Sequence, residues 1–233
     1  MKILVVDDEQ EIRGLLLETL REGAYDILEA ENGADALRII EAESPDLVIL
    51  DILMPNMNGF QVLQQIRETA ETPVIMLSAR ADTVDKVKSF ELGADDYVTK
   101  PFKLIELTAR VAAVLRRTVT NTHNKGKANF NDGRLFIDFT RHQVFVDGKE
   151  LELTPKEYEL LQELVLHAGN VLEYKRLLKN IWGPEYEKEK YLVQAVVRRL
   201  RGKIEVNLEK PQYILAVGGV GYRFKTIPQY FEE

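Results

Sequence analysis

The stretch LVILDILMP, residues 47–55, carries a single acidic residue, Asp51, in an otherwise apolar run. A short, continuous apolar run is typical of a strand that is buried on both faces of a sheet. A lone carboxylate at the end of such a strand is costly, because a charge that leaves water loses its hydration. We therefore expect Asp51 to face groups that compensate its charge.

The residues around this stretch alternate between short apolar runs and amphipathic segments. The strand candidates are residues 2–6, 26–30, 47–50, 74–77 and 96–100. Side chains between them repeat on one face at helical spacing: Leu15, Leu16, Thr19 and Leu20, then Ala36, Leu37 and Ile40, then Val62, Leu63 and Ile66, and later Leu107, Val111 and Leu115. This order predicts an α/β fold, a doubly wound five-stranded parallel sheet with helices on both faces.

Charged and hydroxyl side chains stand at the carboxyl ends of these strands. Asp7 and Asp8 follow the first, Asp51 the third, Ser78 the fourth, and Lys100 ends the fifth. Ligands of open parallel sheets bind at this edge. Acids so close together repel and raise one another's pKa, and a hard cation with oxygen ligands, such as Mg²⁺, resolves that conflict. The alternative is that the acids merely cap turns and helices, but five matched residues at one edge favour a site.

Such an edge suits phosphoryl transfer. We expect the Asp51 carboxylate to act as a nucleophile that accepts a phosphoryl group as an acyl phosphate. This transfer depends on in-line positioning and on neutralised charge, which magnesium, Lys100 and the Ser78 hydroxyl can supply. No histidine lies in these segments, so no general base is predicted.

The second half of the chain has a different pattern. The polar stretch 118–132 lacks periodicity and predicts a linker, which we place at 120–130. Residues 134–154 alternate with period two, and Asp-Gly at 147–148 is a hairpin signal. TPKE at 154–157 predicts a capped helix start. Helices near 174–181 and 188–205 and a hairpin at 213–224 complete an α+β domain.

Charge separates the two halves as well. The chain of 233 residues carries a net charge of −7, yet residues 1–122 carry −9 and residues 175–225 carry +7. Ordinary scatter of surface charge is the alternative, but this asymmetry favours two domains with different partners. The chain has no cysteine, which excludes thiolate metal sites. No apolar run approaches the roughly 18 residues of a membrane span, so we expect a cytoplasmic protein with no membrane partner.

The predicted helix near 188–205 has one apolar and one basic face. Val193, Val196, Val197, Leu200 and Ile204 share the core side. Lys190, Gln194, Arg198 and Arg201 fall on the outer face, flanked by Arg199 and Lys203. A basic helix is often only a solvated face, but with the hairpin that follows it this one predicts binding in the major groove of DNA.

The motifs resemble two parts of one known family. ILVVDDE, VILDILMPNMNGF, VIMLSA and LGADDYVTKPF are similar to the flavodoxin-like receiver domain of bacterial two-component systems. LTPKEYELLQELVLHAGNVL, IWG, RRLRGKIE and GVGYRF are similar to the winged-helix output domain of OmpR/PhoB-type response regulators. The resemblance implies a receiver at 1–119 and a winged-helix DNA-binding domain at 131–227, in a non-enzymatic regulator that a sensor histidine kinase phosphorylates.

The resemblance also assigns roles at the receiver site. It implies that Asp51 is the phosphoacceptor and that Asp8 and Asp51 bind Mg²⁺ with the Leu53 carbonyl, Asp7 acting through water. Ser78 and Lys100 would contact the phosphoryl group, a cis peptide would precede Pro101, and Tyr97 would be a switch aromatic that turns inward. The alternative for Tyr97 is an ordinary half-buried strand residue.

Two interaction surfaces follow from the same resemblance. Phosphorylation would pair two receivers through Lys86, Asp95, Asp96, Glu106, Arg110 and Arg117, with cross-subunit pairs such as Lys86–Glu106 and Asp96–Arg110. The alternative is a solvated face with a pair inside one helix, Glu106–Arg110. Gln194 and Arg199 would lie nearer bases and Arg198 and Arg201 nearer phosphates, with Arg223 also on the DNA side. Residues 183–190 lie where the family meets RNA polymerase, and Trp182 is expected to pack rather than contact DNA.

Two features of the sequence bear on rival functions. Aspartyl-phosphate hydrolases of the haloacid-dehalogenase type place an acid two residues after the nucleophile, and here that residue is Leu53. A DNA binder with a vestigial receiver would not need the complete set of acids, hydroxyl and lysine. Gly218 stands where family members often carry a wing-tip arginine, so minor-groove contact by the wing is not predicted.

Overall fold

The computed structural model describes residues 1–21, 23, 25–79, 83–119 and 130–225, and for 116–119 only the helix that they continue. The chain forms two compact units, Met1–Thr120 and Asn121–Glu233. Within the described residues, no helix is both long and apolar enough to cross a membrane.

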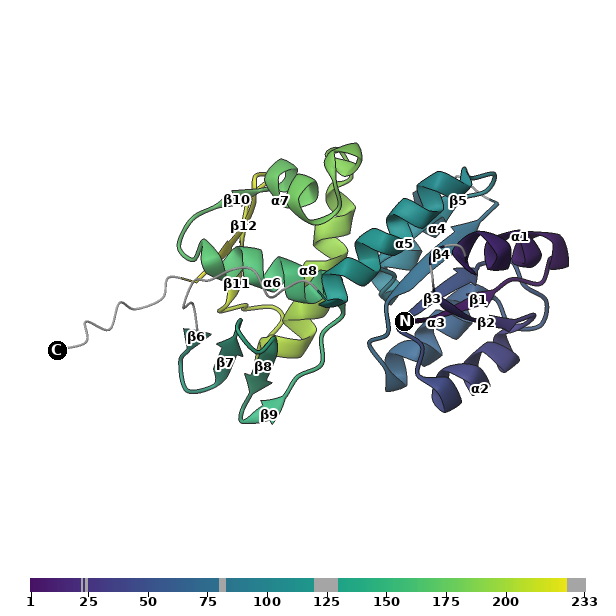
Figure 1. Cartoon of the computed structure of the whole chain (residues 1–233). Helices are drawn as coiled ribbons and strands as arrows, with labels where there is room; N and C mark the ends of the chain where they lie inside the picture. The colour runs from purple at the N-terminus through teal and green to yellow at the C-terminus, as the bar shows by residue number, and fades with distance from the viewer. Residues whose placement is uncertain (22, 24, 80–82, 120–129, 226–233) are drawn as a thin grey trace. The chain divides into compact units, whose positions relative to one another are not determined.

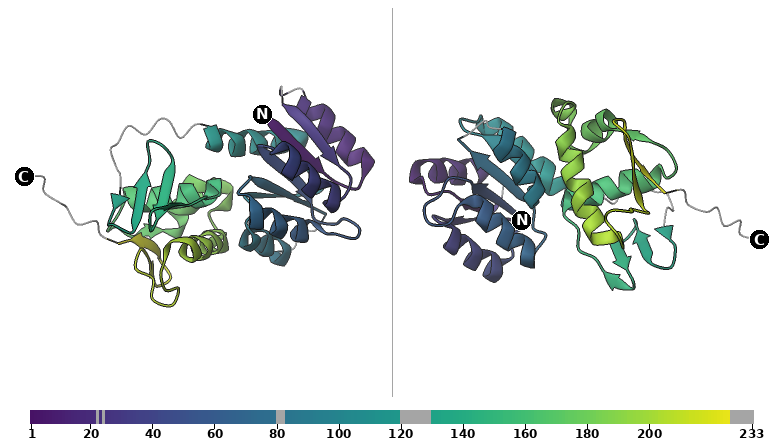
Figure 2. Two further views of the ribbon diagram at one scale, coloured as in Figure 1. Left: turned by 90° about the horizontal axis from the view of Figure 1, so that it is seen from below. Right: turned by 180° about the vertical axis from the view of Figure 1, so that it is seen from behind.

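The first unit is a five-stranded parallel sheet in the order β2-β1-β3-β4-β5. Its elements are β1 (Lys2–Val6), α1 (Gln10–Arg21), β2 (Asp26–Ala30), α2 (Gly33–Glu43), β3 (Leu47–Asp51), α3 (Gly59–Thr69), β4 (Val74–Ser78), α4 (Thr83–Leu92), β5 (Asp96–Thr99) and α5 (Leu104–Val119). Helices cover both faces of this sheet, as Figures 1 and 2 show. The predicted fold is confirmed, with β3 and β4 each one residue longer than expected.

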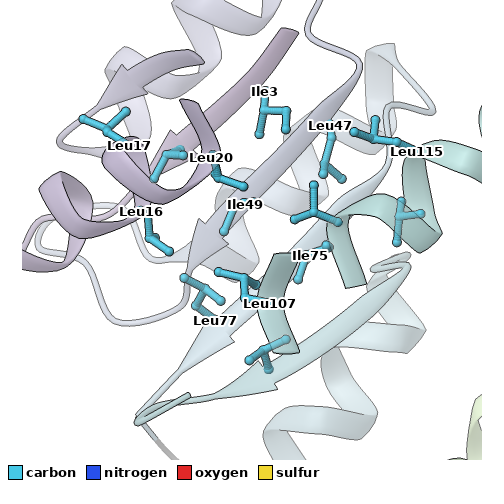
Figure 3. Packing of buried hydrophobic residues seen from close by; sticks show 14 residues of the cluster. Ile3, Leu16, Leu17, Leu20, Leu47, Ile49, Ile75, Leu77, Leu107 and Leu115 are labelled. Carbon is cyan, nitrogen blue, oxygen red and sulfur yellow. The ribbon is translucent and has the colours of Figure 1, made fainter. Parts of the chain in front are cut away.

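The core of this unit lies between the sheet and the pair α1 and α5 (Figure 3). Alternate strand residues such as Ile49 and Leu77 pack there against Leu16 and Leu107. One expectation was wrong: Leu15 is exposed and Leu17 is buried in its place, because α1 is rotated so that its inner face runs through Leu16, Leu17 and Leu20.

The second unit has two small antiparallel sheets and three α-helices in its described residues. Its elements are β6 (Phe130–Asn131), β7 (Leu135–Asp138), β8 (Gln143–Val146), β9 (Lys149–Glu150), α6 (Pro155–Leu166), β10 (Leu172–Glu173), α7 (Tyr174–Ile181), the 3₁₀ turn η1 (Pro184–Tyr186), α8 (Lys190–Ile204), β11 (Ile214–Val217) and β12 (Gly221–Phe224). The sheets have the orders β6-β7-β8-β9 and β10-β12-β11. This is the predicted α+β winged-helix arrangement.

Local sequence signals account for the turns and helix starts of this unit. Asp147 and Gly148, both with positive φ, connect β8 to β9 as predicted. The Thr154 side chain accepts from the Glu157 amide while the Glu157 carboxylate accepts from the Thr154 amide, so the expected capping box starts α6.

The boundary of the predicted linker needs a correction. The sequence pattern places Phe130 in the linker, but this residue belongs to β6 and is 1% exposed. Its ring packs edge-on against Phe224, with centroids 5.2 Å apart, and against Tyr213. An aromatic core residue at the end of a polar segment gave no periodic signal, which is why the sequence placed it outside the domain. The remaining linker residues, 120–129, lie outside the described residues.

Candidate functional site

Asp51 ends β3 and is almost completely buried, with 2% of its surface exposed. The Lys100 Nζ lies 2.6 Å from its Oδ1, and the Leu53 amide donates to its Oδ2 over 2.7 Å. Both oxygens therefore have a partner, as the cost of burying a carboxylate requires. The groups that face Asp51 are the ammonium of the residue following β5 and the backbone of its own loop.

Asp7 converges on the same ammonium. It is fully buried, and its Oδ2 lies 2.8 Å from the Lys100 Nζ while its Oδ1 accepts from the Glu9 amide over 2.9 Å. The Glu9 carboxylate lies 3.5 Å from the same Nζ. Asp8, in contrast, is exposed. The structure thus brings together Asp7, Asp51 and Lys100, as predicted, and places Asp8 at the rim.

Burial and pairing set the charge states at this edge. Burial raises the pKa of Asp51 to about 6, and the Lys100 ammonium offsets this only in part. Burial lowers the pKa of Lys100, but its hydrogen bonds with Asp51 and Asp7 outweigh that effect and leave the Lys100 pKa above its ordinary value. The site therefore favours the charged form of Lys100, whereas burial makes the anionic form of Asp51 less favourable than it is in water.

The remaining predicted residues of the receiver site surround this core. Ser78 is fully buried at the end of β4, and its carbonyl accepts from the Lys100 amide over 2.6 Å. Tyr97 is 4% exposed, so in this structure its ring lies inward. The Leu53 side chain is exposed, and the expected cis peptide precedes Pro101. Arg80, two residues after Ser78, lies outside the described residues.

Two residues that received no role from the sequence complete the geometry. Arg13 on α1 donates from Nη1 to the Asp7 carbonyl over 2.8 Å. Gly59 begins α3 so close to β3 that a Cβ there would lie 2.2 Å from the Asp51 carbonyl oxygen. The Gly in the PNMNGF stretch was a usable signal for such a close approach, whereas an arginine near an acidic loop gives no specific pattern.

The donors at this edge suit a hard cation in kind. Asp7 and Asp51 present carboxylate oxygens to one point, and oxygen-only ligands are those that Mg²⁺ takes. Across the described parts of the chain, no three acidic, histidine or cysteine side chains are grouped closely enough to hold a metal ion as they stand. The oxygen donors therefore fit a cation in kind, while the Lys100 ammonium lies between the two buried acids and Asp8 is exposed.

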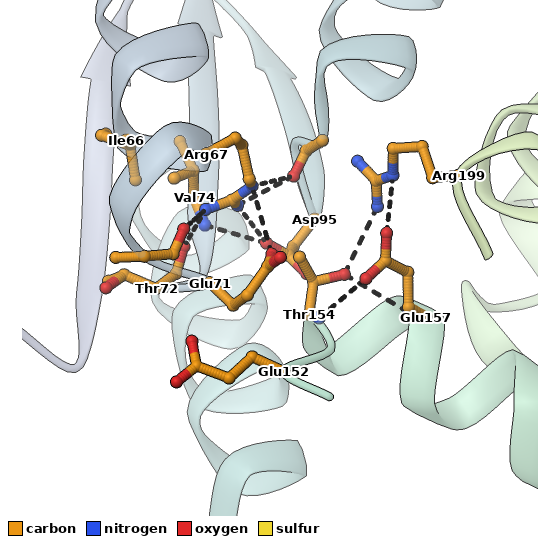
Figure 4. Close-up of polar contacts among 12 residues, drawn as sticks. Ile66, Arg67, Glu71, Thr72, Val74, Asp95, Glu152, Thr154, Glu157 and Arg199 are labelled. Atoms are coloured by element: carbon orange, nitrogen blue, oxygen red, sulfur yellow. Dashed lines mark hydrogen bonds and ion pairs between the residues drawn. The ribbon is translucent and has the colours of Figure 1, made fainter. Parts of the chain in front are cut away.

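The residues predicted for the dimer face do not all lie on one exposed surface. Arg110 on α5 contacts Asp96 at 3.1 Å and Glu106 at 2.9 Å inside one chain. Asp95 is 1% exposed within this chain, and its assignment to the dimer surface stays a prediction. Its carboxylate lies 3.4 Å from Arg67 Nη2 and accepts from the Val74 amide (Figure 4), so it fixes the start of β5. Lys86 is half-buried on α4, and the Arg117 side chain lies outside the described residues.

The basic helix is α8, and its core face is as predicted. Val193, Val196, Val197, Leu200 and Ile204 are all buried. Lys190, Gln194 and Arg198 are exposed at four-residue intervals and so form one stripe along the outer face. Arg201, Arg199 and Lys203 are only partly exposed, so this stripe is the most exposed part of the predicted outer face.

Three further cations of α8 also make contacts within the unit, and the expected base contact of Arg199 stays a prediction. The Arg199 Nε lies 2.9 Å from the Glu157 Oε1, and Lys203 contacts the second oxygen of Glu157 at 2.8 Å (Figure 4 shows the Arg199 contact). Arg201 donates to the Ile214 carbonyl over 2.6 Å. Helical spacing alone placed these residues beside the outer face, and it carries no information on a buried acid supplied by α6.

The tip of the wing is exposed, whereas the segment between α7 and α8 contains buried aromatic residues. Gly218 is exposed at the wing tip, between β11 and β12, and Arg223 is half-buried in β12. Trp182 is 5% exposed, with the Lys156 ammonium 5.1 Å from its ring centroid, so it packs as expected. In the segment 183–190, Tyr186 is buried and anchors η1.

Comparison with known proteins matches both units. Residues 3–112 match the response regulator receiver domain, and residues 148–224 match the C-terminal domain of transcriptional regulatory proteins. The chain is 40% identical to the probable transcriptional regulator ycf27 of Cyanophora paradoxa, over 97% of this chain and 96% of that protein. It is also 40% identical to PhoP, the alkaline phosphatase synthesis transcriptional regulatory protein of Bacillus subtilis strain 168, over 96% of each.

Solved structures match over nearly the full length. The response regulator DrrB of Thermotoga maritima, described as an OmpR/PhoB homolog, is 36% identical with a TM-score of 0.50, covering 96% of this chain and 98% of DrrB. A mutant form of RitR is 27% identical with a TM-score of 0.74, covering 97% of this chain and 99% of RitR.

Proposed function

Because this chain belongs to the OmpR/PhoB-type two-component response regulators, we propose that a sensor histidine kinase phosphorylates it on Asp51, after which it dimerises and binds promoter DNA. Relatives of this family are transcriptional regulators and not enzymes. The cytoplasm is the proposed site of action, since the promoter lies there. One observation carries the proposal: Asp51 is buried at the sheet edge, in contact with Lys100 and beside Asp7.

The proposed reaction forms an acyl phosphate. An Asp51 oxygen attacks phosphorus, and the bond from phosphorus to the donor breaks. Asp8, Asp51 and the Leu53 carbonyl would hold Mg²⁺, with Asp7 acting through water, and the bound cation would neutralise charge on the phosphoryl oxygens. Lys100 gives up its contact with Asp51 and takes a phosphoryl oxygen, and the Ser78 hydroxyl binds another.

The proposed switch links this reaction to assembly. Ser78 moves onto the phosphoryl group, and the inward position of Tyr97 is the one that this movement would stabilise. Two receivers then pair through the surface that carries Lys86, Asp96, Glu106, Arg110 and Arg117. Arg110 already binds Asp96 and Glu106 within one chain, so pairing exchanges internal for cross-subunit partners and sets orientation more than affinity.

The proposed output is sequence-specific binding of double-stranded DNA by α8. The exposed stripe Lys190, Gln194 and Arg198 would face the major groove, where an amide can read adenine and cations bind phosphates. Arg201 and Arg223 would lie nearer phosphates at the edges of the contact. The two winged-helix units of a dimer would occupy direct-repeat half-sites, and residues 183–190 would meet RNA polymerase.

Phosphorylation can be tested directly by mass. A small-molecule phosphodonor with Mg²⁺ should add one phosphoryl group to the wild-type protein and none to Asp51→Asn. Asp26→Asn is the matched control, because Asp26 is exposed and starts β2 at the opposite end of the strands, and it should be labelled as the wild type is. Full labelling of Asp51→Asn would show that the acceptor is a different residue.

A further inference from the structure

The edge of the sheet at the carboxyl ends of the strands, where Asp7, Glu9, Asp51 and Lys100 meet, holds more negative than positive side chains. The Lys100 Nζ lies within 3.5 Å of carboxylate oxygens of Asp51, Asp7 and Glu9, so one ammonium forms ion pairs with three carboxylates. A second cation reaches this edge from α1. The Arg13 side chain is 12% exposed, and a charge so little exposed to water is weakly screened.

The Arg13 guanidinium binds two elements at once. Its Nη1 donates to the Asp7 carbonyl over 2.8 Å, and its Nε lies 3.4 Å from the Glu29 Oε2 near the end of β2. That carbonyl belongs to the peptide that joins Asp7 to Asp8. Because the guanidinium is planar and its donors are fixed relative to one another, these two contacts tie the Asp7–Asp8 peptide to α1 and to β2.

The other polar groups of Asp7 are held as well. Its amide donates to the Ala30 carbonyl over 3.3 Å, one carboxylate oxygen accepts from the Glu9 amide, and the second contacts Lys100. The carbonyl is the remaining group, and Arg13 supplies its donor from outside the DDE stretch. The loop that presents Asp7 and Asp8 is thus fixed by contacts from β2, from α1 and from the residue that follows β5.

We infer that Arg13 is a positioning residue for Mg²⁺, holding the Asp7–Asp8 peptide so that the Asp7 carboxylate faces the site and Asp8, at its rim, can turn toward the cation. This inference rests on the proposed function of the edge. Groups that orient metal ligands without touching the metal typically contribute about 10- to 100-fold in metal affinity. Arg13 acts on a backbone carbonyl, so we place its effect near the lower end, at about tenfold.

Direct titration of Mg²⁺ into the full-length protein, without phosphodonor, tests this role. Arg13→Met keeps most of the aliphatic stem and removes the donors, so isothermal calorimetry should show a dissociation constant about tenfold higher. The rate of labelling by phosphodonor should fall at low Mg²⁺ and return to near the wild-type value at saturating Mg²⁺. Glu29→Gln, which leaves the bond to the Asp7 carbonyl in place, is the matched control and should retain the wild-type affinity.

The outcomes separate this role from others. Equal Mg²⁺ affinity in Arg13→Met and wild type would overturn the inference, and so would a loss in Glu29→Gln as large as that in Arg13→Met. If Arg13→Met does not fold, as judged by thermal unfolding, Arg13→Gln takes its place with the same expectation. The glutamine side chain is shorter than that of arginine, so its amide would not reach the Asp7 carbonyl that the guanidinium binds. A wild-type protein that neither binds Mg²⁺ nor accepts a phosphoryl group would contradict the proposed function itself.

Discussion

Leu53 shows how one side chain bears on the lifetime of the proposed acyl phosphate. Its amide binds the Asp51 carboxylate, while its side chain is 46% exposed beside the site. Hydrolysis needs a water molecule in line with the Asp51–phosphorus bond. Leucine has no donor or acceptor that holds such a water, and its bulk excludes solvent from the approach. We therefore expect slow self-dephosphorylation, with a partner phosphatase resetting the protein.

Leu53→Asn should speed the loss of the phosphoryl group several-fold, because the amide provides a polar anchor for water. The measurement is the decay of purified phosphoprotein followed by mass or by radiolabel. Leu53→Ala is the control that reduces bulk without adding a polar group, and it should have the smaller effect. Decay that is unchanged or slower in Leu53→Asn would contradict this account.

At the residue scale, sequence pattern placed backbone positions better than side-chain contacts. Asp7, Asp51, Ser78 and Lys100 were predictable as neighbours because parallel strands bring their carboxyl ends to one edge. The partners of Arg13 were not, because they depend on how α1 packs against the end of β1. The contact between Asp95 and Arg67 on α3 was not predictable either, because it depends on how α3 packs beside the start of β5.

At the scale of elements, Glu157 connects the start of α6 to the C-terminal half of α8. It is 1% exposed and contacts both Arg199 and Lys203, which lie one turn apart. Burial raises its pKa, but the two cations outweigh burial and hold the Glu157 pKa below its usual range. These contacts fix the rotation of α8, and with it the outward direction of the stripe Lys190, Gln194 and Arg198.

Glu157→Gln should destabilise the second unit by about 3 kcal/mol at pH 7, because it leaves two cations with little exposure to solvent and no acid between them. Glutamine still completes the capping box, so the helix start is preserved. A carboxylate whose pKa is lowered by folding stabilises above its unfolded pKa of about 4.3, and that stability is lost as the pH falls below it. Urea unfolding should therefore show a deficit at pH 7 that shrinks below about pH 4, whereas a deficit independent of pH would contradict the ion pairs.

The surface formed by α4, β5 and α5 supplies the second prediction at this scale. Arg110→Glu places a third acid beside Asp96 and Glu106, so it should weaken dimers of the phosphorylated protein. Each such pair contributes up to about 1 kcal/mol and a twofold dimer repeats it, so the dissociation constant should rise by up to about 30-fold. Sedimentation measures this, with Arg38→Glu on α2 as the control. The same oligomer in wild type and Arg110→Glu would reject this surface.

At the scale of the whole molecule, the sequence predicts the elements of the first unit more accurately than the boundary of the second. The strands of the receiver follow from periodicity to within one residue at each boundary, and its helices follow as amphipathic segments between the strands, because buried parallel strands and amphipathic helices have strong patterns. The start of the second unit was harder to predict, because Phe130 is a core residue that follows a polar segment. The acidic first half and basic α8 match the proposed division of labour between phosphorylation and DNA binding.

The central claim is that phosphorylation of Asp51 controls the occupation of DNA, and footprinting on genomic fragments tests it most directly. The wild-type protein with phosphodonor and Mg²⁺ should protect two direct-repeat half-sites about one helical turn, roughly 10 base pairs, apart. Without phosphodonor that protection should require a much higher protein concentration, and Asp51→Asn should not respond to phosphodonor at all. Protection that is equal with and without phosphodonor in the wild type would contradict the account and identify a DNA-binding protein with a receiver that does not control it.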